Sequence, residues 1–121
     1  MNIPRILVVD DDPSILKFIR ANLEARSYQV LTAVEGEEAI RIAEKEKPDL
    51  IILDIVMPGM DGFSVCRKIR EWSSVPILML SAREGENDLE KCKAYGANDY
   101  LTKPFVLKEL LSMVKAMLKQ E

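Results

Sequence analysis

The sequence contains no histidine among its 121 residues. Without an imidazole, the chain cannot assemble a Ser/His/Asp triad, a Cys/His nucleophile or a histidine general base. No phosphohistidine can reside on it either. Any acid or nucleophilic chemistry must therefore come from carboxylates and lysine.

Cysteine is also scarce, with only Cys66 and Cys92, and each stands alone in a helix-like segment. Zinc sites and redox motifs need several cysteine or histidine ligands at short spacings. We therefore expect two structural thiols.

Long hydrophobic runs and an excess of basic charge are missing as well. No apolar run approaches the ~20 residues that cross a bilayer, and no basic-then-apolar leader precedes the first strand-like run. Lys and Arg total 17 against 20 Asp and Glu, which gives a net charge of -3. Because a nucleic-acid surface is usually a concentrated basic patch, we expect a cytoplasmic domain that contacts neither membrane nor nucleic acid directly.

The sequence does contain short apolar runs that alternate with amphipathic stretches. The length favours one domain over residues 1–121. Residues 6–9, 50–53 and 77–80 are almost continuously apolar, which is typical of strands covered on both faces of a parallel sheet. Residues 28–32 and 99–102 are mixed and predict edge or weaker strands.

Helical stripes follow the strand-like runs, so the pattern predicts an α/β fold with right-handed crossovers and helices on both faces. The segment from Glu86 to Tyr95 has few large apolar side chains, and we expect it to be the least firmly packed helix. Asp12 before Pro13 and Asp61 predict helix N-caps, and Gly96 predicts a helix C-terminus. The apolar stripes are Ile15, Leu16, Ile19 and Leu23; Ala39, Ile40 and Ala43; Phe63, Cys66 and Ile69; and Leu107, Leu110, Leu111, Val114 and Leu118.

Polar residues gather where the predicted strands end, which is where ligands bind in open parallel sheets. They are Asp10, Asp11, Asp54, Ser81 and Lys103. Three close carboxylates repel one another unless a cation neutralises them, and oxygen-only ligation favours Mg²⁺ or Mn²⁺. We expect Asp11 and Asp54 to be direct ligands, Asp10 to act through water, and the Val56 carbonyl to complete the set.

The same groups suit phosphoryl transfer. A lysine can pair with one phosphoryl oxygen and a serine can donate to another, while a metal holds the third. In this arrangement Asp54 is the nucleophile.

Four segments closely resemble the receiver domain of bacterial two-component response regulators, in order and at the family's spacing. The resemblance implies a flavodoxin-like doubly wound sheet of five parallel strands in the order 2-1-3-4-5. It also implies a regulatory phospho-acceptor rather than an enzyme acting on other substrates. The segments are residues 6–12 (ILVVDDD), 50–62 (LIILDIVMPGMDG), 76–82 (PILMLSA) and 96–105 (GANDYLTKPF).

By this resemblance, a sensor histidine kinase donates the phosphoryl group to Asp54 in a Mg²⁺-dependent step. Asp10 and Asp11 form the acidic pair that binds the metal, and Lys103 is the lysine of the site. Ser81 and Tyr100 are the switch residues. The peptide bond between Lys103 and Pro104 is expected to be cis.

Two further positions tune the lifetime of the phosphate in this family, and here they are Val56 and Arg83. Valine cannot orient an attacking water by hydrogen bonding, so we expect slow hydrolysis. The resemblance places kinase specificity on the first helix, around Ile15, Phe18 and Asn22.

Residues 67–82 are similar to receivers of the winged-helix transcription-factor class. Members of that class dimerise on phosphorylation through the fourth helix, fifth strand and fifth helix, and they reach DNA through a C-terminal output domain. Asp99 and Glu109 suit such a dimer, whereas Leu89, Asn98 and Met113 stand where the class commonly has charge. The sequence is compatible with a stand-alone receiver and with one part of a longer regulator.

Two other functions compete with this interpretation. A Mg²⁺-dependent phosphohydrolase would need a second acid two residues beyond Asp54, where Val56 stands, and room for a substrate-selecting cap. A degenerate receiver that binds partners without phosphate would lose some site residues, and none is lost here.

Overall fold

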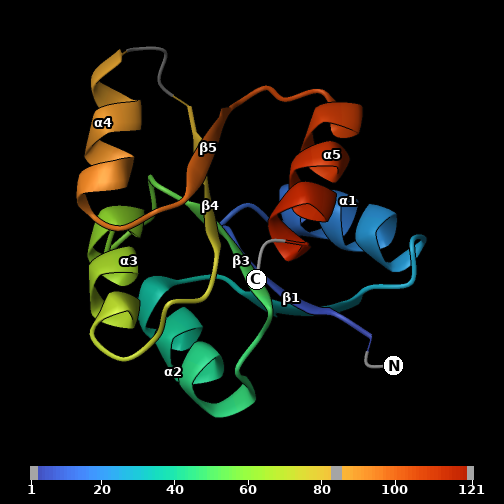
Figure 1. Ribbon diagram of the computed structural model, residues 1–121, viewed down its shortest axis with the longest axis horizontal. Helices are drawn as coiled ribbons and strands as arrows, with labels where there is room; N and C mark the ends of the chain where they lie inside the picture. The colour runs from blue at the N-terminus through green and yellow to red at the C-terminus, as the bar shows by residue number, and fades with distance from the viewer. Residues whose placement is uncertain (1–2, 83–85, 120–121) are drawn as a thin grey trace.

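The computed structural model describes residues 3–82 and 86–119. Strands and helices alternate along the chain, as the sequence predicts (Figure 1). The elements are β1 (Arg5–Val9), α1 (Pro13–Glu24), β2 (Gln29–Ala33), α2 (Gly36–Glu46), β3 (Leu50–Asp54), α3 (Gly62–Arg70), β4 (Ile77–Ser81), α4 (Glu86–Ala94), β5 (Asp99–Thr102) and α5 (Leu107–Leu118).

The strands form one parallel sheet in the order β2-β1-β3-β4-β5, which confirms the predicted doubly wound topology. The apolar strands β3 and β4 are buried along their whole length. The mixed strands β2 and β5 lie at the two edges, as expected, because an edge strand is covered less completely.

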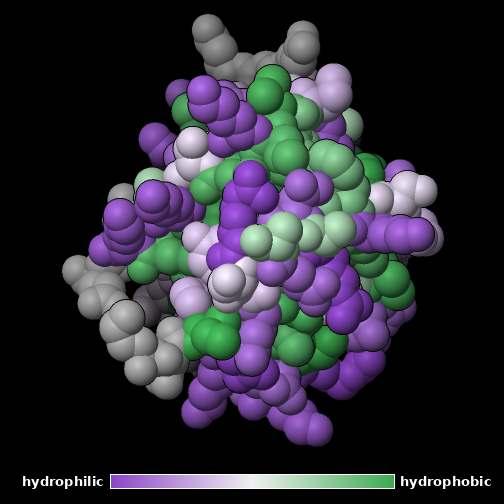
Figure 2. Space-filling model, turned by 90° about the vertical axis from the view of Figure 1, so that its right-hand side faces the viewer, coloured by the Kyte–Doolittle hydropathy of each residue, from purple (hydrophilic) through white to green (hydrophobic). Residues whose placement is uncertain are grey.

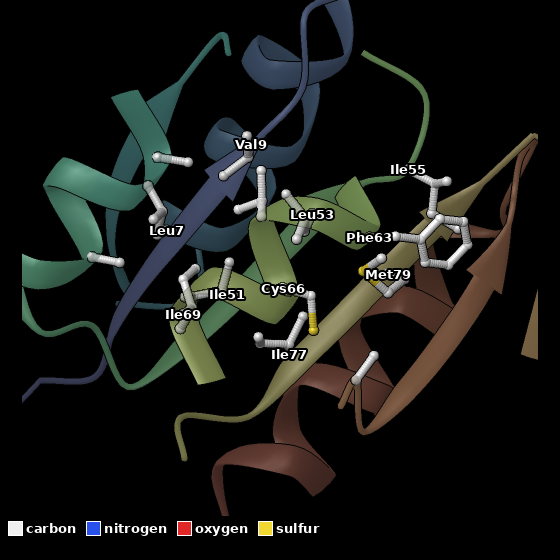
Figure 3. Packing of buried hydrophobic residues seen from close by; sticks show 14 of the residues in the cluster. Leu7, Val9, Ile51, Leu53, Ile55, Phe63, Cys66, Ile69, Ile77 and Met79 are labelled. Carbon is white, nitrogen blue, oxygen red and sulfur yellow. The ribbon is translucent and has the colours of Figure 1, made fainter. Parts of the chain in front are cut away.

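Alternate side chains of each central strand enter separate cores on the two faces of the sheet. Leu7 and Val9 of β1 pack into the cluster shared with α2, α3 and α4, part of which Figure 3 shows. Ile6 and Val8 pack into the cluster shared with α1 and α5. The sheet is therefore held from both faces, and its carboxyl edge is free to carry polar groups.

Local signals set the ends of the helices as predicted. The Asp12 side chain accepts a hydrogen bond from the Ser14 N–H at 2.9 Å, and Asp61 accepts one from the Ser64 N–H at 2.9 Å. Gly96 follows α4 with a φ of +100°, a conformation that favours glycine.

Two other features of the chain agree with the sequence, namely the two thiols and the packing of α4. Cys66 in α3 and Cys92 in α4 are buried and are not joined in a disulfide. Among the α4 side chains that the structure describes, those of residues 89–94, Cys92 alone is buried. This fits the expected light packing of the helix. Within the described residues, no helix is both long enough and apolar enough to span a bilayer.

Candidate functional site at the carboxyl edge of the sheet

The buried polar side chains of the described chain all lie at the carboxyl edge of the sheet. Asp10 follows β1, Asp54 ends β3 and Ser81 ends β4, and they expose 0%, 4% and 1% of their surface. Since β1, β3 and β4 are adjacent and parallel, the fold brings these three groups to one place. Burying polar groups costs free energy unless they are paired, so this edge is built around their interactions.

An acidic cluster forms the centre of the site. Carboxylate oxygens of Asp10, Asp11 and Asp54 all lie within 4.8 Å of one another. Asp10 and Asp54 are buried, whereas Asp11 is exposed and opens the cluster to solvent. A set of three oxygen donors at this spacing fits a hard divalent cation such as Mg²⁺.

Lys103 supplies the positive charge of the site. Its Nζ donates to Asp10 Oδ2 at 2.9 Å and lies 3.3 Å from Asp54 Oδ1. Burial opposes the charged lysine, but the hydrogen bond to Asp10 and the charges of both aspartates outweigh it and raise the Lys103 pKa. The peptide bond between Lys103 and Pro104 is cis, as the resemblance implied.

Asp10 is held on both of its oxygens. Oδ2 accepts from Lys103, and Oδ1 accepts the Asp12 N–H at 2.9 Å. Asp10 is therefore fixed in orientation, while exposed Asp11 is unrestrained by any hydrogen bond found within the described residues. The sequence placed the two residues side by side and could not separate these environments.

The surroundings of Asp54 disfavour its charged form. Burial, and next the negative charge of Asp10, raise the Asp54 pKa from 3.8 to about 6, although Lys103 and a backbone hydrogen bond from Val56 oppose the rise. A cation that joined the cluster would relieve this repulsion. An aspartate in this environment is suited to attack an electrophile whose charge the same cations stabilise.

The remaining predicted site residues surround this centre. Val56 lies two residues beyond the end of β3 and exposes 52% of its surface. Tyr100 in β5 is half-buried and packs against the core shared with α2, α3 and α4. Arg83 lies outside the described residues. On α1, Phe18 exposes 48% of its surface near half-buried Ile15 and Asn22.

The sequence analysis did not predict a group of hydrogen bonds at the amino edge of the sheet. Arg70 donates to the Gly96 carbonyl at 2.8 Å and to Asn98 Oδ1 at 3.0 Å. The same Asn98 oxygen accepts the Ile77 N–H at 2.8 Å. Arg70 and Asn98 therefore connect the end of α3 and the segment after α4 to the start of β4. The sequence analysis noted Asn98 only as an uncharged residue on a possible dimer face.

Comparisons with known proteins agree with this fold. The sequence pattern of the response regulator receiver domain matches residues 6–115. The chain is 48% identical over 117 residues to the alkaline phosphatase synthesis transcriptional regulatory protein PhoP of Bacillus subtilis, covering 96% of this chain and 49% of that protein. It is 40% identical over 114 residues to the heme response regulator HssR of Staphylococcus aureus, covering 94% of this chain and 51% of that protein. The chain thus spans about half the length of these relatives.

Solved structures show the same likeness in three dimensions. The BeF3-activated N-terminal receiver domain of Klebsiella pneumoniae RstA superposes with a TM-score of 0.91 at 33% identity, covering 96% of this chain and 99% of that one. A putative response regulator from Chloroflexus aurantiacus superposes with a TM-score of 0.93 at 36% identity, covering 98% of this chain and 100% of that one. The chain belongs to the response regulator receiver domains, regulatory modules of phosphorelay signalling.

Proposed function

We propose that Asp54 accepts a phosphoryl group from the phosphohistidine of a sensor histidine kinase and later releases it to water. In the first step an Asp54 oxygen forms a bond to phosphorus while the phosphorus–nitrogen bond of the donor breaks. In the second, water attacks the aspartyl phosphate and inorganic phosphate leaves. The observation that carries this proposal is the buried Asp54 carboxylate with Asp10, Asp11 and Lys103 around it.

The acidic cluster would hold Mg²⁺, or Mn²⁺, through Asp11 and Asp54 directly, through Asp10 by way of water and through the Val56 carbonyl. When bound, the metal would neutralise charge on the phosphoryl oxygens. Lys103, which already contacts Asp54, would pair with a phosphoryl oxygen.

Phosphorylation adds charge of about -1.5 to -2 at Asp54, which favours movement of the Ser81 hydroxyl and Lys103 toward it. Inward movement of Ser81 at the end of β4 would let Tyr100 on adjacent β5 become more buried than it is here. The face formed by α4, β5 and α5 would then change shape. Val56 and Arg83 would set the lifetime of the phosphate.

The whole protein would be a cytoplasmic transcription regulator. The support is its similarity to PhoP, a transcriptional regulatory protein, and the half of that protein that this chain does not cover. A C-terminal winged-helix output domain would contact DNA, whereas the receiver would contact the kinase.

The proposal is tested by intact mass after incubation with acetyl phosphate, with and without Mg²⁺. We expect one Mg²⁺-dependent phosphoryl adduct on the wild type and on Asp99→Ala, an exposed aspartate outside the site, and none on Asp54→Ala. The absence of an adduct on the wild type, or its persistence in Asp54→Ala, would overturn the proposal and favour a phosphate-independent binding module.

Phosphorylation would also promote a homodimer through α4, β5 and α5. Asp99 and Glu109 are both exposed on this face, and Leu89 and Met113 are half-buried there. We expect the phosphorylated domain to elute earlier from a size-exclusion column, and Glu109→Lys to reduce the shift more than Glu44→Lys on α2. An unchanged elution volume on phosphorylation contradicts the dimer.

A further inference from the structure

A groove of about 530 Å³ lies between the turn that follows α1 and one face of α5, on the α1/α5 side of the sheet. The site described above contributes none of the residues that line it. Figure 2 views this side of the molecule and shows hydrophobic surface bordered by hydrophilic side chains. The groove is lined by Arg26, Tyr28, Leu107, Lys108, Leu111, Ser112 and Lys115.

The floor of the groove is apolar. Tyr28, Leu107 and Leu111 are half-buried and rest on the core beneath α1 and α5. Each therefore keeps part of an apolar side chain open to a ligand. Contact with them would remove that surface from water, which favours a partner that carries apolar groups of its own.

The rim is positively charged. Arg26, Lys108 and Lys115 are exposed, and no carboxylate lines the groove within the described residues. None of the three forms an ion pair with another described residue. Three unpaired cations around one groove are notable in a chain whose net charge is -3, and they would attract a negatively charged partner.

The shape of the groove limits the kind of partner. Leu107, Leu111 and Lys115 follow one another at helical spacing, so the groove extends about 12 Å along α5 at about 1.5 Å per residue. That length suits about two turns of a helix. A nucleic acid would satisfy the cations through its phosphates but would leave the apolar floor unused.

We propose that this groove is a docking site for an acidic amphipathic segment of another protein, with apolar side chains on its floor and carboxylates at Arg26, Lys108 and Lys115. The groove shares α5 with the α4–β5–α5 face, but its lining includes neither Glu109 nor Met113, and it does not depend on Asp54. It would give the receiver a second contact that is available without phosphorylation.

The test uses the unphosphorylated protein and a synthetic peptide of about twelve residues with leucines at i, i+4 and glutamates between them. Backbone NMR titration should shift the amide signals of Tyr28, Leu107 and Leu111. Lys108→Glu combined with Lys115→Glu should weaken binding by about tenfold or more. Arg26→Glu, on the opposite wall, should also weaken it.

Lys93→Glu on α4, an exposed position on the other side of the sheet with the same charge change as Arg26→Glu, should leave binding unchanged. A matched peptide with glutamine in place of glutamate should bind more weakly. Equal binding of the glutamine peptide, or shifts that map elsewhere, overturns the proposal. Binding of single-stranded DNA at the groove as tight as that of the acidic peptide also overturns it.

Discussion

At the scale of single residues, the site is defined by an imbalance of charge. The buried carboxylates of Asp10 and Asp54 share the ammonium of Lys103, and exposed Asp11 adds a further negative charge nearby. Asp10 keeps the shorter contact with Lys103, so Asp54 is the less compensated of the two. Asp54, the proposed phosphoryl acceptor, is thus also a source of instability in the metal-free fold.

Replacing Asp54 with asparagine should stabilise the domain when no divalent metal is present. The folded pKa of about 6 lies above the ordinary 3.8, so between these values the folded state binds more protons than the unfolded state. The free energy of unfolding of the wild type therefore falls as pH rises from 3.8 to about 6, and the full destabilisation by the Asp54 charge is present above this range. Asp54→Asn avoids this cost and should raise the free energy of unfolding by about 1–3 kcal/mol at neutral pH.

Urea denaturation in the presence of a chelator measures this effect. The gain of Asp54→Asn should shrink as pH falls from 7 toward 4, while Glu44→Gln, an exposed glutamate on α2, should show no such trend. A constant difference between wild type and Asp54→Asn across that range would show that the Asp54 charge is not the cause.

Val56 should govern how long a phosphoryl group remains on Asp54. Its side chain is about half exposed beside the acceptor, where it can exclude water but cannot hydrogen-bond to it. Val56→Asn adds a group that can orient the attacking water and should speed hydrolysis on the order of tenfold. Loss of the adduct over time, followed by intact mass, gives the rate. Val34→Asn is a matched exposed valine outside the site, and equal rates for Val56→Asn and the wild type would refute the role of Val56.

At the scale of elements, α3 links β3 to α4. Its first residue, Gly62, approaches the backbone of β3 so closely that a Cβ would lie 2.7 Å from Ile55 Cα and would also meet the Asp54 carbonyl oxygen. Farther along, the Phe63 ring contacts Tyr95 with centroids 5.2 Å apart, and Lys91 Nζ lies 4.6 Å from the Phe63 centroid. The helix therefore contacts both the site and the lightly packed α4.

Gly62→Ala should force β3 and α3 apart and destabilise the fold by about 1–3 kcal/mol, as overpacking does elsewhere. Chemical denaturation measures the loss. Ser64→Ala, an exposed position in the same helix, should change stability by less than about 0.5 kcal/mol. If Gly62→Ala were as stable as the wild type, the backbones of α3 and β3 would be able to move apart without a loss of free energy of unfolding.

The sequence predicted the elements well because periodicity and end signals act locally. Apolar runs marked β3 and β4, and Asp12 and Asp61 marked the starts of helices. Observed strands differ from the expected ranges by about one residue at an end, because pairing with a neighbouring strand decides where a strand stops.

Contacts between distant segments were not predictable in the same way. Nothing in the spacing of Arg70 and Asn98 signals that they meet, since 28 residues separate them. Likewise, the sequence places Asp10 and Asp11 side by side and does not show that one is buried and the other exposed. Only the fold buries Asp10 beneath Lys103, which is 93 residues away along the chain, and leaves Asp11 in solvent.

At the scale of the whole molecule, the sheet is packed on both faces while its carboxyl edge holds like charges together. A ligand that binds this edge only in the folded state should therefore stabilise the entire domain. The acidic cluster combines residues from β3 and from the segment after β1, so it exists only when the sheet is assembled.

Mg²⁺ should accordingly raise the unfolding temperature. A free concentration ten times the Kd contributes about 1.4 kcal/mol, which corresponds to about 3–6 °C for a domain of this size. Because Asp11 is exposed, Asp11→Asn should leave metal-free stability within about 0.5 kcal/mol of the wild type and yet abolish most of the Mg²⁺ shift. Thermal unfolding across a Mg²⁺ titration, with Glu44→Gln as the charge-matched control, measures both effects. A full Mg²⁺ shift in Asp11→Asn would mean that the cation binds elsewhere, because an intact site needs the solvent-facing carboxylate to complete it.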